Sequence, residues 1–209
     1  MKSIAELIQA VQKQEHGFLV IQKEAELFVK DNSIPECLDV SKQLLSSEII
    51  QARALATFML GFIAVKSDKA FTLLKDEVSK DVSWQVQEIL AKAFDRYCLD
   101  IGYEKALPVI KEWLQDSNPN LRRAVTEGLR IWTGRPYFKE NPRVAIRLLS
   151  ALKADESEYV RKSVGNALRD ISKKHKELVK AEVAGWDLTD KQVNQTYKLA
   201  SKFLDLERT

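Results

Sequence analysis

Residues that form tight turns are scarce in this 209-residue sequence, which has seven glycines and five prolines. Folds built from many short strands need such residues at their frequent turns. No window alternates apolar and polar residues for long enough to require a half-buried strand. The sequence therefore predicts an all-α protein.

Cysteine and histidine are scarcer still. Cys37 and Cys98 lie in apolar helical contexts, where we expect packing as small hydrophobic residues rather than a disulfide, as suits a reducing cytosol. His16 and His175 do not complete a zinc site with these cysteines, and neither lies in a pattern typical of a catalytic triad. Glycine is too scattered for a phosphate-cradling loop. We expect no metal and no cofactor.

The sequence has neither a basic-then-apolar signal segment nor an apolar run of about 18 residues. These absences favour a cytoplasmic protein with no membrane partner. It also has no low-complexity linker. The sequence therefore predicts a single domain over residues 1–209.

Positive charge is concentrated in the second half of the chain. Residues 118–209 carry 19 Lys/Arg against 12 Asp/Glu, a net charge of +7, whereas residues 1–117 carry 14 against 18, a net charge of −4. Between residues 119 and 153, eight basic residues are opposed only by Glu127 and Glu140. Arginine-rich charge of this kind suits phosphate contacts, although charged runs are more often a solvated surface.

A repeated sequence motif, here called the phrase, predicts the fold. It consists of an aliphatic residue, a polar or basic pair, and then small and apolar residues, and it recurs at Val86, Leu121 and Val160 in steps of 35 and 39 residues. A weaker copy begins near Ala52, 34 residues before Val86. The clearest copy is YVRKSVGNALRDI at residues 159–171. Self-similarity at this period is typical of stacked helical hairpins.

Caps and prolines set the expected helix boundaries. Pro119 and Pro142 suit the first turn of a helix, and Ser157 and Thr189 are N-cap candidates. The predicted helices span residues 3–14, 18–30, 35–46, 48–65, 67–79, 83–100, 104–115, 119–132, 142–154, 157–174, 176–185 and 189–205. They form about six hairpins of a right-handed α-α superhelix of the HEAT or armadillo type. Residues 1–47 are the expected N-terminal cap and residues 48–209 the repeats, with the phrase helices on the concave side.

Charged and aromatic residues recur on the phrase helices. Trp84 and Glu88 share one helix face, as do Arg123 and Glu127, and Asp170 follows on the third phrase helix. Glu88 and Arg123 occupy the same phrase position, so stacking of the repeats predicts that they lie close together. Each residue alone has a structural explanation: Trp84 as a packing residue, and Arg123 with Glu127 as an i,i+4 pair worth about 0.2–0.5 kcal/mol. Taken together they favour a binding or catalytic groove.

The same phrases resemble the HEAT-like-repeat DNA alkylation repair family, the AlkC and AlkD group of alkylpurine DNA glycosylases. The resemblance spans roughly residues 80–185 and is carried by WQVQE at 84–88, RRAVTEG at 122–128 and SEYVRKSVGNALRDISK at 157–173. It implies that Glu88, Glu127 and Asp170 are the catalytic acids. It also implies that Trp84 contacts the lesion, and that Asn166 stands where AlkD-type members carry a second tryptophan.

The resemblance implies a monofunctional glycosylase that removes cationic N3- or N7-alkylpurines from duplex DNA. Carboxylates would stabilise the oxocarbenium-like sugar and hold a water, and arginines would bind phosphates. The implied phosphate-binding residues are Arg122, Arg123, Arg130, Arg161, Lys162 and Arg169. We expect a monomer that associates with the nucleoid when bound to DNA. The alternative is a non-catalytic scaffold that binds a DNA structure or a protein partner.

Overall fold

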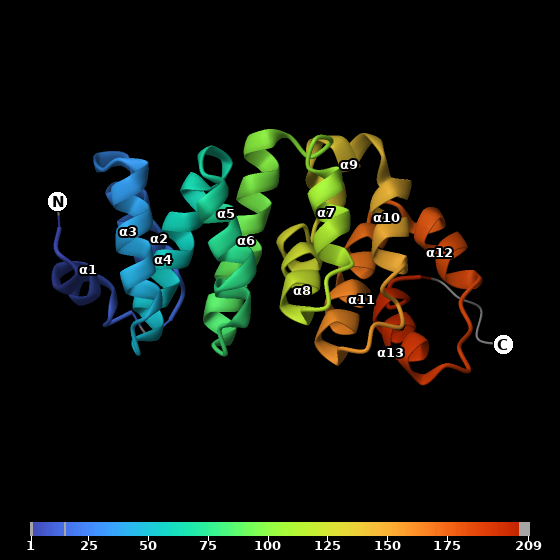
Figure 1. Ribbon diagram of the computed structural model, residues 1–209. Helices are drawn as coiled ribbons and strands as arrows, with labels where there is room; N and C mark the ends of the chain where they lie inside the picture. The colour runs from blue at the N-terminus through green and yellow to red at the C-terminus, as the bar shows by residue number, and fades with distance from the viewer. Residues whose placement is uncertain (1, 15, 205–209) are drawn as a thin grey trace. The chain divides into compact units, whose positions relative to one another are not determined.

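The computed structural model describes residues 2–14 and 16–204, and all regular secondary structure in these ranges is helical (Figure 1). The prediction of an all-α helical-repeat fold is confirmed. The chain divides between Ile101 and Gly102 into two compact units, here called unit 1 and unit 2. The single-domain prediction and the cap at residues 1–47 stay predictions. No helix in the described ranges is both long and apolar enough to span a membrane.

Unit 1 is built around one buried helix. Its helices are α1 (Ile4–Val11), α2 (Leu19–Asp31), α3 (Ile34–Leu45), α4 (Ile50–Ile63), α5 (Asp68–Asp76) and α6 (Trp84–Ile101), with 3₁₀ turns η1 (Ala64–Lys66) and η2 (Val78–Lys80). Helix α4 packs against α2, α3, α5 and α6 and is buried on all sides, as its nearly continuous apolar sequence requires. Gly61 lets α6 approach closely, because a Cβ there would lie 2.7 Å from the Cβ of Ala93.

Unit 2 repeats this plan around α11. Its helices are α7 (Leu107–Leu114), α8 (Pro119–Gly128), α9 (Pro136–Glu140), α10 (Pro142–Ser150), α11 (Glu158–Ser172), α12 (Lys176–Ala184) and α13 (Lys191–Ala200), with the 3₁₀ turn η3 (Trp132–Gly134). Helix α11 packs against α8, α10, α12 and α13. At Gly165 a Cβ would lie 2.6 Å from the Cβ of Leu199 and 2.9 Å from the carbonyl of Thr196, so α13 crosses α11 almost in backbone contact.

Several helix boundaries differ from the prediction. Helix α8 ends at Gly128 rather than residue 132, and the chain turns through η3 into α9, which the sequence analysis missed because it is a single short turn after Pro136. Asp190, not Thr189, caps α13: its side chain accepts from the backbone N–H groups of Gln192 and Val193. Ser157 does precede α11, but its side chain makes no cap bond. Residue 205, the predicted end of the last helix, lies outside the described residues.

The two cysteines pack as expected. Both Cys37 and Cys98 are buried as reduced thiols. Burial, followed by the nearby Glu36 carboxylate, raises the pKa of the Cys37 thiol. Cys37 and Cys98 therefore behave as small hydrophobic side chains in unit 1.

An arginine in the repeated phrase ties each of three repeats together, and two of the three are buried. Arg122 donates from Nη1 to the carbonyls of Asp116 and Ser117 in the preceding loop, at 2.7 and 3.0 Å. It also forms a bidentate ion pair with Asp155 in the next repeat, with Nε–Oδ2 at 2.7 Å and Nη2–Oδ1 at 2.8 Å. Because both charges are almost fully buried, this bidentate pair fixes the loop between α10 and α11 against α8.

The same device occurs at the equivalent phrase positions. Arg53 donates to the carbonyls of Ser47 and Glu48 and pairs with Asp81. Arg161 donates to the carbonyls of Asp155 and Glu156 and to Oε1 of Gln195. In α6 the position holds Gln87, whose amide donates to the carbonyls of Val78 and Asp81. Each donor thus gives loop carbonyls a side-chain hydrogen-bond partner within its own repeat.

We predict that Arg122→Ala lowers the free energy of unfolding by about 3–5 kcal/mol, because it leaves the buried Asp155 carboxylate without its cation. Urea denaturation measures this change. The matched control is Arg143→Ala on the exposed side of α10, expected within about 0.5 kcal/mol of the unmodified protein. Equal effects of the two variants would contradict the structural role of Arg122.

We further predict that Gly165→Ala separates α11 from α13. Overpacking costs about 1–3 kcal/mol, against a gain of about 1 kcal/mol in helix propensity. The net effect should be destabilising, whereas Gly185→Ala should be neutral or stabilising because its Cβ would meet nothing closer than 3.9 Å. Urea denaturation of both variants tests this, and a stabilised Gly165→Ala protein would contradict the close crossing.

Candidate functional site

An acid–base cluster joins α8 and α11 in unit 2. Arg130 bridges two of the predicted catalytic acids: its Nη1 lies 3.1 Å from Oε1 of Glu127, and its Nε lies 3.2 Å from Oδ2 of Asp170. The Arg130 side chain is 43% exposed, whereas the two carboxylates are 17% and 12% exposed. The structure therefore brings Glu127 and Asp170 to one cationic bridge that solvent can reach.

Asp170 has two further cationic neighbours. Nζ of Lys173 lies 2.8 Å from Oδ1, and Nη2 of Arg169 lies 3.7 Å from the same oxygen. Burial raises the pKa of Asp170, but the hydrogen bonds from Lys173 and Arg130 outweigh it, so the pKa is lowered overall. Asp170 is consequently a carboxylate at neutral pH, surrounded by more positive than negative charge.

Buried hydroxyls hold Glu127 from the other side. Oγ of Ser163 donates to Oε2 of Glu127 at 2.9 Å, and Oγ1 of Thr126 lies 2.8 Å from that Oγ. Thr126 and Ser163 are both buried between α8 and α11. The sequence analysis missed this network. It also missed the role of Lys173, although residues three apart on a helix, such as Asp170 and Lys173, are expected to be neighbours.

Arg123 lies on the same helix as Glu127. Its guanidinium carbon stands 4.2 Å from the ring centroid of Tyr159, a cation–π contact between α8 and α11. Only 5% of Arg123 is exposed. The sequence analysis named Arg123 as the structural partner of Glu127, and the structure adds Arg130, one turn further along, as a cation that pairs with this acid.

Two predicted site residues belong to unit 1. Trp84 is the first residue of α6 and is 61% exposed, and Glu88 follows one turn later and is half-buried. Trp84 lines a small pocket of about 100 Å³ with residues that include His16, Phe18 and Gln51. Because Arg123 lies in unit 2, its closeness to Glu88 stays a prediction.

The predicted phosphate-binding residues fall into two groups. The first group is buried: Arg122, Arg123 and Arg161 are each less than a tenth exposed. Arg122 and Arg161 donate their hydrogen bonds to loop carbonyls and side chains of unit 2. Lys162, by contrast, is about half exposed, Arg130 is nearly as open, and Arg169 is 20% exposed. Asn166, half-buried on α11, lies one helical turn before Asp170.

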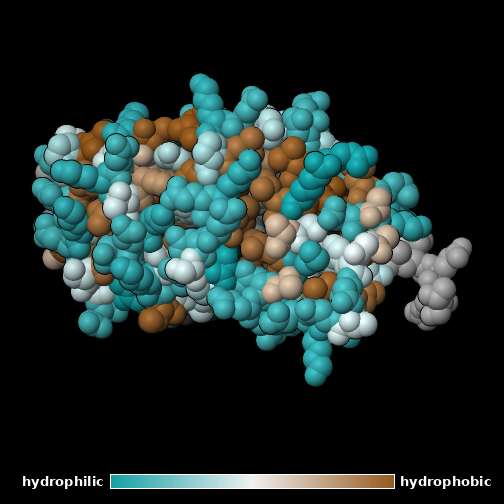
Figure 2. All heavy atoms as spheres, turned by 45° about the vertical axis from the view of Figure 1, so that its right-hand side comes forward, coloured by the Kyte–Doolittle hydropathy of each residue, from teal (hydrophilic) through white to brown (hydrophobic). Residues whose placement is uncertain are grey.

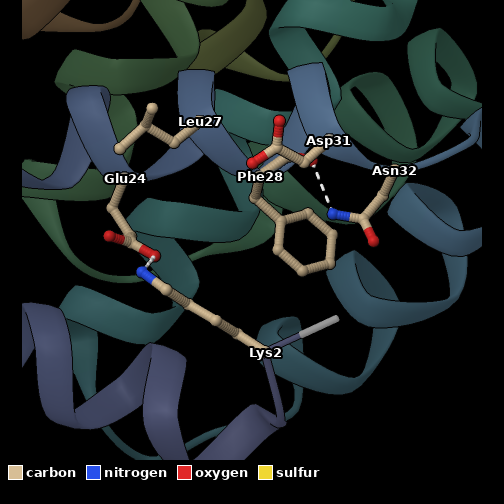
Figure 3. Close-up of a pocket in the computed structure, with 6 residues that line it drawn as sticks. All are labelled: Lys2, Glu24, Leu27, Phe28, Asp31 and Asn32. Atoms are coloured by element: carbon tan, nitrogen blue, oxygen red, sulfur yellow. Dashed lines mark hydrogen bonds and ion pairs between the residues drawn. The ribbon is translucent and has the colours of Figure 1, made fainter.

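A separate pocket of about 320 Å³ lies beside α2 in unit 1 (Figure 3). Its lysine and one of its acids neutralise each other, with Nζ of Lys2 2.5 Å from Glu24, and the amide of Asn32 donates to the carbonyl of Phe28.

No group of three His, Cys, Asp or Glu side chains that could hold a metal occurs in residues 2–14 and 16–204. The surface in Figure 2 is mostly hydrophilic, with scattered hydrophobic side chains between.

The stacked hairpins and the acid–base cluster of unit 2 define a helical-repeat protein whose second half carries the excess of positive charge. The family model described as DNA alkylation repair enzyme matches residues 19–199. The chain belongs to this family. Its similarity to the uncharacterized protein YhaZ of Bacillus subtilis (strain 168) is 37% identity over 90 residues, which covers 41% of this chain and only 25% of YhaZ.

Solved structures agree with this assignment. AlkD2 from Streptococcus mutans is 52% identical, with a TM-score of 0.95 over 97% of this chain and 98% of that chain. The alkylpurine DNA glycosylase AlkC from Pseudomonas fluorescens, solved bound to DNA containing an abasic site analog, is 22% identical, with a TM-score of 0.72 over 94% of this chain and 56% of that chain. The second likeness shows a common fold.

We predict a pH-dependent effect of Asp170→Asn on stability. The pKa of Asp170 is lowered by folding, so its contribution is present above the unfolded pKa near 3.8 and is lost as pH falls through the folded pKa. The substitution should cost about 1–3 kcal/mol at pH 7 and clearly less at pH 3. Urea denaturation at both pH values measures this, and an equal cost at both would show that the ion pairs contribute nothing.

Proposed function

We propose that this protein binds duplex DNA and hydrolyses the N-glycosidic bond of cationic N3- or N7-alkylpurines. The observation that carries the proposal is an ionised carboxylate, Asp170, at an accessible cationic cluster of unit 2 in a chain of the DNA alkylation repair family. Binding a polyanion and stabilising a transient cation need opposite charges close together, and this cluster offers both.

The protein needs to supply little acid catalysis because a cationic base is already a good leaving group. As the bond breaks, positive charge develops on the deoxyribose, and Asp170, with Glu127 and Glu88, would stabilise it and position the attacking water. The exposed indole of Trp84 offers an aromatic face to the sugar or the cationic base. No lysine is assigned a Schiff base, so the reaction would end at the abasic site.

Phosphate contacts would come from the accessible cations. Arg130, just after the end of α8, is 43% exposed. Lys162 and Arg169 on α11 are 54% and 20% exposed, whereas Arg122 and Arg161 act inside the fold. Contacts with phosphates fix the position of a protein on DNA without reading its sequence. Binding should therefore show little sequence preference and should weaken as salt concentration rises.

A second candidate function, DNA binding without base excision, is favoured by the partners of the acids. Arg130, Lys173 and Ser163 already engage Glu127 and Asp170, and a neutralised carboxylate stabilises a cationic sugar less well. Asn166 also offers no aromatic ring at the position where the family pattern has a second tryptophan. In this role the protein would be a scaffold that binds a DNA structure or a protein partner.

We predict that the double variant Glu88→Gln/Asp170→Asn releases alkylpurines more slowly, by a factor on the order of 10²–10³ in a single turnover. Its affinity for DNA should be equal or slightly tighter, because two negative charges are removed beside a polyanion. The measurement is chromatographic quantification of 3-methyladenine and 7-methylguanine released from methylated duplex DNA, together with binding by fluorescence anisotropy.

The control for this experiment is Glu177→Gln, which removes one exposed charge from α12. It should leave base release unchanged. Full activity in the double variant would reject the proposed chemistry. Folded, DNA-binding protein that releases no base would support the second candidate function instead.

A further inference from the structure

An open groove of about 440 Å³ lies between α11 and α13 in unit 2. Lys162 lines it from α11, and Lys191, Asn194, Gln195, Lys198 and Leu199 line it from α13. The four polar residues of α13 are spaced i, i+3, i+4 and i+7, so they form one face of that helix. This face forms the basic wall of the groove.

The charge of the groove is positive. Three ammonium groups and two amides line it, and no acid is among its lining residues. Two acids lie nearby. Glu158 is bound by Lys162 at 2.7 Å, and this hydrogen bond is the main reason for its lowered pKa, to which Gln195 also contributes. Asp190 accepts from backbone amides at the start of α13.

The amide of Gln195 is oriented by a buried arginine. Its Oε1 accepts from Nε of Arg161 at 2.8 Å, and Arg161 is itself fixed by the carbonyls of Asp155 and Glu156. With the oxygen turned to the arginine, the NH₂ group is available as a donor on the other side, toward Glu158. The close crossing at Gly165 holds α13 against α11, so the donors stand on a rigid support.

We infer that this groove binds backbone phosphates of a DNA strand, extending the DNA-binding surface of the proposed function to the last helix of the described chain. Lys191 and Lys198 are two helical turns apart, about 10.5 Å along the axis, which matches the rise of about three nucleotides at 3.4 Å each. The Glu158 carboxylate, held by Lys162 and Gln195, is the acceptor that a phosphate oxygen would replace.

The test is the salt dependence of binding to a duplex DNA oligonucleotide, measured by fluorescence anisotropy. The variant Lys191→Gln/Lys198→Gln should lower the slope of log affinity against log salt by about 1.8, since each phosphate contact contributes about 0.9. The matched control is Lys139→Gln/Lys180→Gln, which removes the same charge from α9 and α12 of unit 2. It should leave the slope nearly unchanged.

A third variant tests the role of Glu158. Glu158→Gln should tighten DNA binding several-fold at low salt by removing the acid that competes for Lys162 and Gln195. Glu177→Gln removes the same charge from α12 and should tighten binding clearly less. Thermal unfolding of every variant confirms that the helices remain folded, so that a changed affinity reports the groove.

The outcomes separate this inference from the proposed function on which it rests. Wild-type binding with equal slopes for the groove and control variants would overturn the groove while leaving DNA binding elsewhere on unit 2 intact. Failure of the wild-type protein to bind duplex DNA at any salt concentration would overturn both. A slope lowered only by the groove variant supports the inference, whether or not base release is detected.

Discussion

The repeats depend on an arginine, buried at Arg122 and Arg161 and partly buried at Arg53, that joins a helix to the preceding loop and to a side chain of the following repeat. Arg53, Arg122 and Arg161 each donate to two loop carbonyls five and six residues earlier and to a side chain in the following repeat. A guanidinium is suited to this because it is planar, always charged and carries five donors in a fixed geometry. Without it, the buried Asp81 and Asp155 carboxylates would lose their cationic partner.

These arginine contacts also position the residues of the candidate site. By fixing the loop before α11 against α8, Arg122 sets the register in which Arg130 reaches across to Asp170 and Ser163 reaches Glu127. One residue further along the phrase, the side chains point elsewhere: Arg123 lies against Tyr159, and Lys162 opens toward α13. Both cations of the pair Arg122–Arg123 are therefore buried, whereas in the pair Arg161–Lys162 only Arg161 is.

The sequence predicted the fold more completely than the surroundings of the candidate site residues. The repeat period, the helix-rich composition and the prolines at α8 and α10 were visible in the sequence, and they predicted the all-α fold and most helices. Helical spacing on the phrase helices also drew attention to Glu127 and Asp170, which the structure brings to one bridge. Charge counting could not separate Arg122 from Lys162, because both are basic residues in the same kind of phrase, and only burial distinguishes them.

The sequence by itself determined the repeat, the helical class and the excess of positive charge in the second half, because these follow from periodicity and composition. Only the tertiary structure decided which basic residues are buried inside the fold, that Arg130 pairs with Asp170, and that α13 crosses α11 at Gly165. These features depend on contacts between residues some 30 to 40 positions apart, and a one-dimensional pattern contains the spacing of such residues but not the directions of their side chains.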